Sequence, residues 1–140
     1  MTRIVVGVDG SAHARAALRW ALDEARLRHA DVLAVHTYRP AMASLDVPRT
    51  YVDLHPAARA MLADEVAKAR AEAGTEVTVE QHVADADAAA TLVRLARAGD
   101  LVVVGSHGHG VLASTFLGST SHYVACHAPC PVVIVKEARP

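Results

Sequence analysis

The sequence predicts an α/β domain in which an open, parallel, five-stranded sheet is covered by helices on both faces. Short apolar runs alternate with longer segments of helical period, in the order β-α-β-α-β-α-β-α-β. The runs are continuously apolar, as is typical of parallel strands that are buried on both faces and joined by right-handed crossovers. The chain has 140 residues, 52% of them hydrophobic, which is enough for one core. We therefore expect a single domain over residues 1–140.

The first part of the chain predicts two strands joined by a helix. Residues 2–9 form a β-branched run that ends in a Gly-Val-Asp-Gly-Ser loop, and residues 31–38 form a second apolar strand. Ser11 is a suitable cap for a helix that runs to about His29. The expected buried face of this helix is Leu18, Ala21, Leu22 and Ala25.

The middle of the chain predicts a loop, a helix and a strand. Residues 40–56 contain three prolines and no clear period, so we expect a long loop there. A helix over residues 56–73 ends at Gly74, and the alternating residues 76–83 form a strand with one wetter face. The expected buried stripe of the helix is Ala58, Leu62, Val66, Ala69 and Ala73.

The last part predicts two more helix–strand pairs. A third helix begins at Asp85 or Asp87 and is stopped by Gly99-Asp100. Its expected inward residues are Ala89, Leu92, Val93 and Ala96. The elements that follow are a deeply buried strand at 101–105, a short helix at 119–127 and a final strand at 132–136.

Composition and charge exclude several classes of partner. The 14 basic and 15 acidic residues nearly balance and the basic residues are scattered, so we expect no nucleic-acid partner. No apolar run approaches the roughly 20 residues that span a bilayer, and the N-terminus has a strand pattern rather than that of a signal peptide. We therefore expect no membrane association and a cytoplasmic location, in which Cys126 and Cys130 are free thiols.

Two glycine-containing loops predict a ligand site. One follows the first strand at residues 7–11, and the other follows the fourth strand at residues 105–121. If those strands are neighbours, the loops converge where ligands bind open parallel sheets. Their amides and the following helix N-terminus favour phosphate. The spacing matches neither a P-loop nor the G-x-G-x-x-G dinucleotide fingerprint.

The residues Gly105-x2-Gly108-x9-Gly118-Ser119 resemble the G-x2-G-x9-G-[ST] signature of the ATP-binding universal stress proteins. The resemblance covers the whole chain and includes IVVGVDGS with Asp9, the VHTY segment and the closing HAPCPVVIVK. It implies a Rossmann-like sheet of the HUP type with strand order 3-2-1-4-5, and binding of ATP with Mg²⁺.

Carried over position by position, the resemblance also implies roles for residues. Asp9 lies near the ribose or a metal on the phosphates, and the backbone at Thr37 faces the adenine. Thr120 stands where an apolar residue is common in the family. The expected ATP-binding residues are Gly7, Asp9, Thr37, Gly105, His107, Gly108, His109, Gly110, Val111, Gly118, Ser119 and Thr120.

Several of these residues have a purely structural alternative. Asp9 is also suited to an Asx turn or a helix cap, and Ser119 to an N-cap. For His107 and His109, the backbone amides are better candidates for phosphate than the side chains. We expect His36 to be a hydrogen-bonded core residue rather than a ligand.

A second constellation raises the alternative of a zinc or redox site. His122, Cys126, His127 and Cys130 are soft ligands within nine residues. Because a C-x3-C spacing is not a usual zinc knuckle, small buried thiols are the preferred interpretation.

The last strand predicts an interface. Four apolar residues on a sheet edge favour pairing with a second copy, giving a two-fold dimer. The expected dimer residues are Val132, Val133, Ile134 and Val135.

Together these observations favour an ATP-binding module that acts as a nucleotide-dependent regulator or sensor in a stress response. The loops hold no Lys, Arg or Glu for fast phosphoryl transfer, so we expect at most a slow ATPase. The alternatives are a slow ATP hydrolase or adenylate-transfer enzyme, and a dimeric interaction module without nucleotide.

Overall fold

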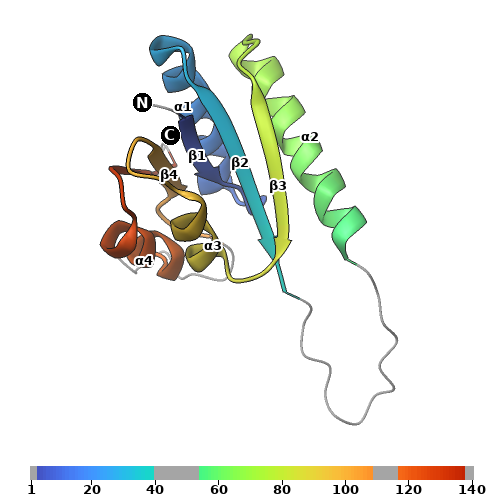
Figure 1. Cartoon of the computed structure of the whole chain (residues 1–140). Helices are drawn as coiled ribbons and strands as arrows, with labels where there is room; N and C mark the ends of the chain where they lie inside the picture. The colour runs from blue at the N-terminus through green and yellow to red at the C-terminus, as the bar shows by residue number, and fades with distance from the viewer. Residues whose placement is uncertain (1–2, 40–53, 109–116, 138–140) are drawn as a thin grey trace, which may run out of the picture.

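The computed structural model describes residues 3–39, 54–108 and 117–137 of the chain. In these residues, five strands alternate with four helices, and Figure 1 shows the arrangement of the labelled elements. The elements are β1 (Arg3–Gly7), α1 (Ala12–Arg28), β2 (Asp31–Tyr38), α2 (His55–Ala73), β3 (Val79–Asp85), α3 (Ala88–Leu95), β4 (Leu101–Gly105), α4 (Ser119–His127) and β5 (Val132–Val135).

The strands form one parallel sheet with the order β3-β2-β1-β4-β5, which confirms the predicted fold. The chain moves outward from β1 through β2 to β3, then returns to β4 on the other side of β1. The order therefore reverses between β1 and β4, where Val5 lies opposite Val102. In open parallel sheets, ligands bind beyond the carboxyl ends of the strands at this switch point.

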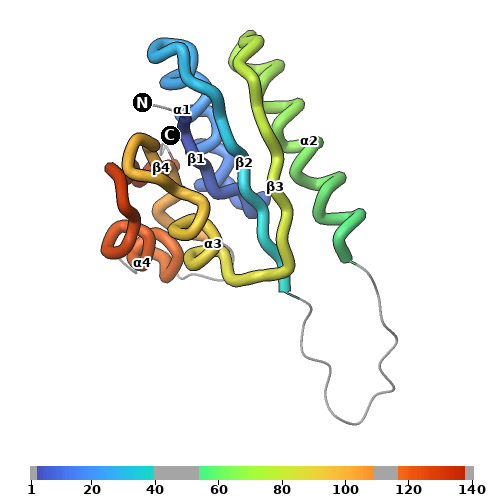
Figure 2. Tube along the Cα trace, in the orientation of Figure 1, coloured from blue at the N-terminus to red at the C-terminus, as the bar shows by residue number. Residues whose placement is uncertain are grey.

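Two apolar cores cover the two faces of the sheet. Ile4 and Val6 pack with Leu18 of α1 and Leu62 of α2 on one face. The alternate residue Val5 belongs to the second core, which includes Leu92 of α3 and Val124 of α4. Successive residues of β1 thus enter opposite cores, as the period of a strand requires. Figure 2 shows α3 and α4 lying side by side.

The predicted helix caps are present. Ser11 Oγ accepts a hydrogen bond from the Ala14 amide, and the Asp87 carboxylate accepts one from the Ala90 amide. Gly74 ends α2 in the left-handed region with φ 59°, as glycine does without steric cost. Of the two candidates for the start of α3, Asp87 is the cap.

Two element boundaries differ from the prediction because side chains form local turns. β3 begins at Val79 rather than residue 76, since Thr75 Oγ1 accepts the Val77 amide at 3.3 Å. α3 ends at Leu95, before Gly99-Asp100. There the Asp100 carboxylate accepts the Arg97 amide at 3.0 Å, which holds a turn in place of further helix.

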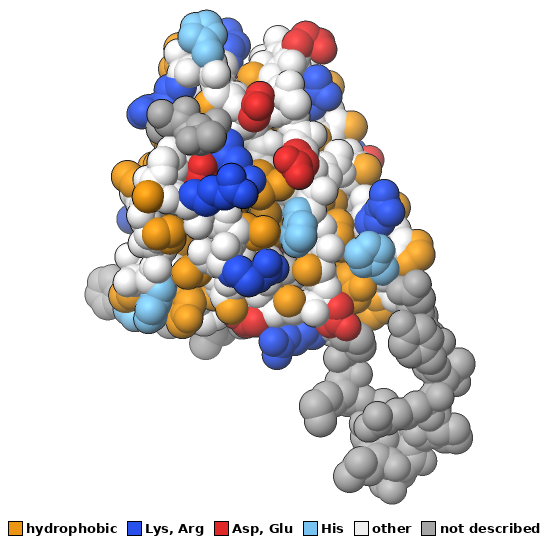
Figure 3. Space-filling model, viewed as in Figure 1, with side chains coloured by type: hydrophobic (Ala, Val, Ile, Leu, Met, Phe, Trp, Pro, Cys, Tyr) orange, Lys and Arg blue, Asp and Glu red, His pale blue; other side chains and the backbone are white. Residues whose placement is uncertain are grey.

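The molecular face drawn in Figure 3 mixes basic, acidic and apolar side chains. Within residues 3–39, 54–108 and 117–137, no helix is long and apolar enough to cross a membrane.

Candidate functional site

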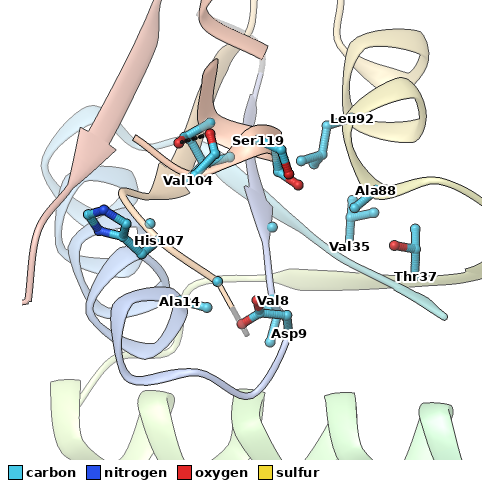
Figure 4. Close-up of a pocket in the computed structure, with 16 residues that line it drawn as sticks. Val8, Asp9, Ala14, Val35, Thr37, Ala88, Leu92, Val104, His107 and Ser119 are labelled. Carbon is cyan, nitrogen blue, oxygen red and sulfur yellow. Dashed lines mark hydrogen bonds between the residues drawn. The ribbon is translucent and has the colours of Figure 1, made fainter. Parts of the chain in front are cut away.

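A cavity of about 240 Å³ lies at the carboxyl ends of β1 and β4 (Figure 4). Segments from β2, α3 and α4 complete its walls. The residues that line it are Gly7, Val8, Asp9, Ala14, Val35, Thr37, Ala88, Leu92, Val104, Gly105, His107, Gly108, Gly118, Ser119, Thr120 and Ser121. A cavity therefore lies at the switch point, where the sequence predicted that the two glycine-containing loops converge.

One side of the cavity, here called the apolar side, consists of Val35, Thr37, Ala88 and Leu92. Figure 4 shows these four side chains together, with His107 on the opposite side. Val35 and Leu92 are buried, while Ala88 at the start of α3 is half-buried. A mainly apolar wall with a single hydroxyl is suited to a flat, uncharged ring.

The opposite side, here called the glycine cradle, consists of residues 105–108 and 118–120. Its two segments are joined by hydrogen bonds to one carbonyl: the Gly118 amide donates to Ser106 O at 2.7 Å, and Ser121 Oγ donates to the same oxygen at 3.2 Å. Ser121 is itself buried. The cradle is therefore held across its two segments by the backbone of Ser106.

Asp9 lies between the two sides of the cavity. Its Oδ1 accepts hydrogen bonds from the Ser11 amide at 2.9 Å and the Ser11 hydroxyl at 2.5 Å, which makes an Asx turn before α1. Its Oδ2 lies so close to Gly108 that a Cβ on that glycine would come within 2.6 Å. The structural interpretation of Asp9 is therefore confirmed, and the same residue also lines the cavity.

The glycines of the signature have different surroundings. A Cβ at Gly105 would lie 2.7 Å from the backbone carbonyl carbon of His13, so this glycine permits α1 to pack closely on β4. A Cβ at Gly118 would meet nothing nearer than 3.4 Å. Gly105 is required by helix packing, whereas a Cβ at Gly118, which lines the cavity, would make only ordinary contacts with the backbone of residues 106–108.

The start of α4 corrects one structural alternative. Gly118 is the N-cap residue, with no side-chain hydrogen bond, and Ser119 is the first residue of the helix. The suggestion that Ser119 caps the helix is therefore wrong. Ser119 and Thr120 instead line the cavity from the first turn of α4.

His36 is hydrogen-bonded, as expected, but it is half-buried rather than part of the core. Its Nδ1 donates to Val8 O at 2.8 Å, and the Val8 amide donates to Val35 O at 2.8 Å. These two bonds fix the chain where it leaves β1.

His107 is held through its side chain. Its Nδ1 is 3.0 Å from Ser106 Oγ, and its ring centroid is 5.2 Å from that of His13. The predicted ligands His109, Gly110 and Val111 lie outside the described residues.

Sequence reasoning missed two groups of site residues. Ala88 and Leu92 form part of the apolar side, but small and aliphatic residues at helical spacing predict only a core. His13 and Ser106 support His107, yet they are 93 residues apart in sequence. The sole local signal is Ser106, a small polar residue that directly follows a buried strand.

The alternative zinc site is not formed. Among the residues that the structure describes, no three His, Cys, Asp or Glu side chains lie together in a way that could hold a metal ion. The interpretation of both cysteines as buried thiols is wrong for Cys126, which is exposed. Cys130 is half-buried, and both its burial and the nearby Asp100 carboxylate raise the pKa of its thiol.

Comparisons with known proteins agree with this geometry. Residues 1–136 match the sequence profile described as the universal stress protein family. A universal stress protein of Mycolicibacterium smegmatis is 35% identical over 133 residues, which cover 95% of this chain and 45% of the relative. The chain therefore spans about half the length of the curated relatives it matches.

Solved structures of universal stress proteins have a similar fold. The universal stress protein UspA from Lactobacillus plantarum is 26% identical with a TM-score of 0.69, covering 96% of this chain and 97% of that one. A universal stress protein solved in complex with cAMP is 26% identical with a TM-score of 0.68, covering 98% of each chain. Because the universal stress protein profile matches residues 1–136 of this chain, the chain belongs to the universal stress protein family.

Proposed function

We propose that this chain binds an adenine nucleotide in the cavity at the switch point, with ATP and Mg²⁺ as its full ligand. Acting through that nucleotide, it would serve as a regulatory or sensor module in a stress response. The family match and the cAMP complex of a similar protein support nucleotide binding. The observation that carries the proposal is a glycine cradle that faces an apolar wall across one cavity.

The apolar side is the proposed place for the adenine. Val35 and Leu92 offer aliphatic contact to the ring faces, and Ala88 leaves room beside them. The backbone at Thr37 is the proposed hydrogen-bond partner of the ring edge. Burial of an aromatic ring against such side chains favours binding through the hydrophobic effect.

The glycine cradle is the proposed place for the phosphates. A Cβ at Gly108 would come within 2.6 Å of Asp9 Oδ2, so the absence of a side chain there leaves backbone accessible to a ligand. The first turn of α4, with Ser119 and Thr120, adds helix amides and hydroxyls. Asp9 is the proposed partner of the Mg²⁺ that accompanies ATP, because hard cations prefer carboxylate oxygens.

The charges of the cavity favour holding a ligand over transferring phosphate. Among the described lining residues, Asp9 is the one carboxylate and His107 the one imidazole, and none is Lys or Arg. Fast phosphoryl transfer relies on cations that stabilise the developing charge. We therefore expect turnover of ATP to be slow or undetectable in a phosphate-release assay.

The direct test is mass spectrometry of the purified protein for bound nucleotide, followed by calorimetric titration with ATP, AMP and cAMP, with and without Mg²⁺. Binding in the micromolar range is expected. Gly118→Leu should weaken it by roughly tenfold or more, since its side chain would lie over the Gly108 amide.

Gly118→Ala is the matched control, because a Cβ there makes only ordinary contacts. Absence of binding in the wild type would overturn the proposal. Equal affinity in Gly118→Leu would show that the ligand lies elsewhere.

We also propose a dimer through β5, which is an edge strand of the sheet. The Pro131 and Val135 carbonyls accept hydrogen bonds from β4, so the alternate residues Val132 and Ile134 direct their amides outward. Pairing with the same strand of a second copy would satisfy these amides.

The free thiols of Cys126 and Cys130 suit a reducing compartment such as the cytoplasm.

Light scattering tests the dimer. Ile134→Pro removes one outward donor, so it should shift the protein toward monomer. Ile134→Ala loses a similar amount of packing but keeps the donor, so it should remain a dimer. A wild-type chain that is monomeric at micromolar concentration would contradict the proposal.

A further inference from the structure

Three polar side chains outside the apolar side of the cavity form a connected cluster. Ser106 Oγ lies 3.2 Å from His13 Nδ1 and 3.0 Å from His107 Nδ1. The two imidazole rings are tilted by 59° with centroids 5.2 Å apart. The cluster joins the first turn of α1 to the glycine cradle, and Ser106 at its centre is 1% exposed.

The cluster also reaches the segment that follows β5. The Glu137 amide donates to His13 Nδ1 at 3.1 Å, and the Ser106 amide donates to Val135 O at 2.9 Å. His13 thus contacts the glycine cradle on one side and the chain beyond the sheet edge on the other.

The donors define the proton positions. A backbone N–H can only donate, so His13 Nδ1 accepts this hydrogen bond through its lone pair, and the ring hydrogen lies on Nε2. The Ser106 hydroxyl can then donate to the same nitrogen and accept from His107 Nδ1–H. A proton on His13 Nδ1 would face the Glu137 N–H directly and break this arrangement.

We propose that neutral His13 is a positioning residue for the glycine cradle: it fixes Ser106 and His107 together with the segment after β5. The part of this proposal that concerns ligand affinity rests on the proposed nucleotide function. A proton on His13 Nδ1 would release both contacts, so nucleotide affinity should fall on acidification.

Other charged groups lie on the segments that pack around His13. The Arg15 guanidinium is already paired with Glu65. The groups concerned are Asp9 before α1, Arg15 on α1, His107 in the cradle, and Lys136 and Glu137 after β5.

The first experiment needs no nucleotide. Long-range ¹H–¹⁵N correlation spectra of the free protein report the tautomer of each histidine. The proposal predicts a His13 ring with its proton on Nε2 at about pH 7.5, where free histidine is mostly neutral. It also predicts faster hydrogen exchange of the Glu137 amide in His13→Leu. A proton on Nδ1, or unchanged Glu137 exchange, would overturn it.

The second experiment measures cAMP affinity between about pH 7.5 and pH 5.5, since a phosphodiester lacks the second phosphate ionisation near pH 6. Wild-type affinity should fall at least about threefold on acidification. His13→Asn keeps an acceptor near the Nδ1 position but cannot be protonated, so its affinity should match the wild type at the higher pH and change much less. His13→Leu should bind weakly at both values.

His29→Asn is the control, because His29 lies in the left-handed region that asparagine tolerates, at the far end of α1. It should retain the wild-type pH profile. An unchanged pH profile in His13→Asn would contradict the role of His13. If cAMP does not bind the wild type, the nucleotide function fails for this ligand, and the spectra alone decide the positioning role.

Discussion

The two ends of β4 have opposite chemistry. At its amino end, the side chain of Asp100 is fully buried and accepts a hydrogen bond from Arg3 Nε at 3.2 Å, while Arg3 Nη2 donates to Leu95 O at 2.6 Å. At its carboxyl end, Gly105 leads into a cradle whose backbone borders a cavity. A charged pair fills the amino end, whereas glycines, which have no side chains, leave a cavity at the carboxyl end. We propose that the amino end serves stability and that the carboxyl end serves binding.

The carboxyl end itself contains both roles. Gly105 makes room for the backbone of His13, whereas Gly118 borders the cavity. Under the proposed function, a single sequence signature combines a packing requirement with a binding requirement. The predictions below test this division, from the largest expected effect to the smallest.

Arg3→Met should cause the largest loss, about 3 kcal/mol of unfolding free energy, because it leaves the Asp100 carboxylate buried without its cation. Urea denaturation measures this loss. Adding Asp100→Asn to Arg3→Met removes the orphaned charge and should recover part of the stability. Nucleotide affinity of the folded fraction should not change in either variant. A loss of nucleotide affinity as large as that of Gly118→Leu would contradict the proposed division between stability at the amino end of β4 and binding at its carboxyl end.

Gly105→Ala should destabilise the domain by about 1–3 kcal/mol, because its Cβ would collide with backbone of α1 that cannot rotate away. Gly118→Ala should change stability by less than about 0.5 kcal/mol. Paired urea denaturation curves compare the two variants. Equal stability would show that Gly105 has no packing role.

Asp87→Ala should cost about 1 kcal/mol, because the Ala90 amide loses its capping acceptor at the start of α3. Since α3 carries Ala88 and Leu92 into the cavity, nucleotide affinity should fall slightly as well. Asp87→Asn, which keeps an acceptor oxygen, should restore most of both losses. Thermal denaturation and calorimetry measure the two effects, and a destabilised variant with full affinity would separate α3 from the site.

The smallest expected effect is a difference between the two cysteines in their rate of alkylation. Iodoacetamide should modify the exposed Cys126 first, because Cys130 is half-buried and burial together with Asp100 raises the pKa of its thiol. Alkylation of Cys130 should accelerate as the pH rises toward that elevated pKa. Asp100→Asn should speed it at a given pH. Mass spectrometry of timed samples identifies the order, and faster modification of Cys130 would contradict this account of the amino end.

Much of the fold was predictable because local signals and burial agree. The apolar run at residues 31–38 matches β2, and Ser11, Asp87 and Gly74 mark helix ends through backbone chemistry that the sequence displays. The start of β3 was not predictable from alternation, since the hydroxyl of Thr75 folds the preceding residues into a turn. One side-chain hydrogen bond, from the Val77 amide to Thr75 Oγ1, stabilises this turn in place of the first residues of the strand.

The site was predictable only in part, for a related reason. The two glycine-containing loops predict the cradle, and the family resemblance implies the place of Asp9; both line the cavity. The contribution of Leu92 depends on how α3 rests on the sheet, and that of His13 depends on the close approach that Gly105 permits. These are tertiary contacts, and residue type and spacing do not reveal them.

The most direct test of the central claim is an amide chemical-shift titration of the wild-type protein with ATP and Mg²⁺. We expect the largest shifts at the Gly108, Gly118 and Ser119 amides, and negligible shifts at Arg97 and Leu101 beside the buried Arg3–Asp100 pair. Shifts centred on the amino end of β4, or no shifts at millimolar nucleotide, would contradict the assignment of binding to the carboxyl end.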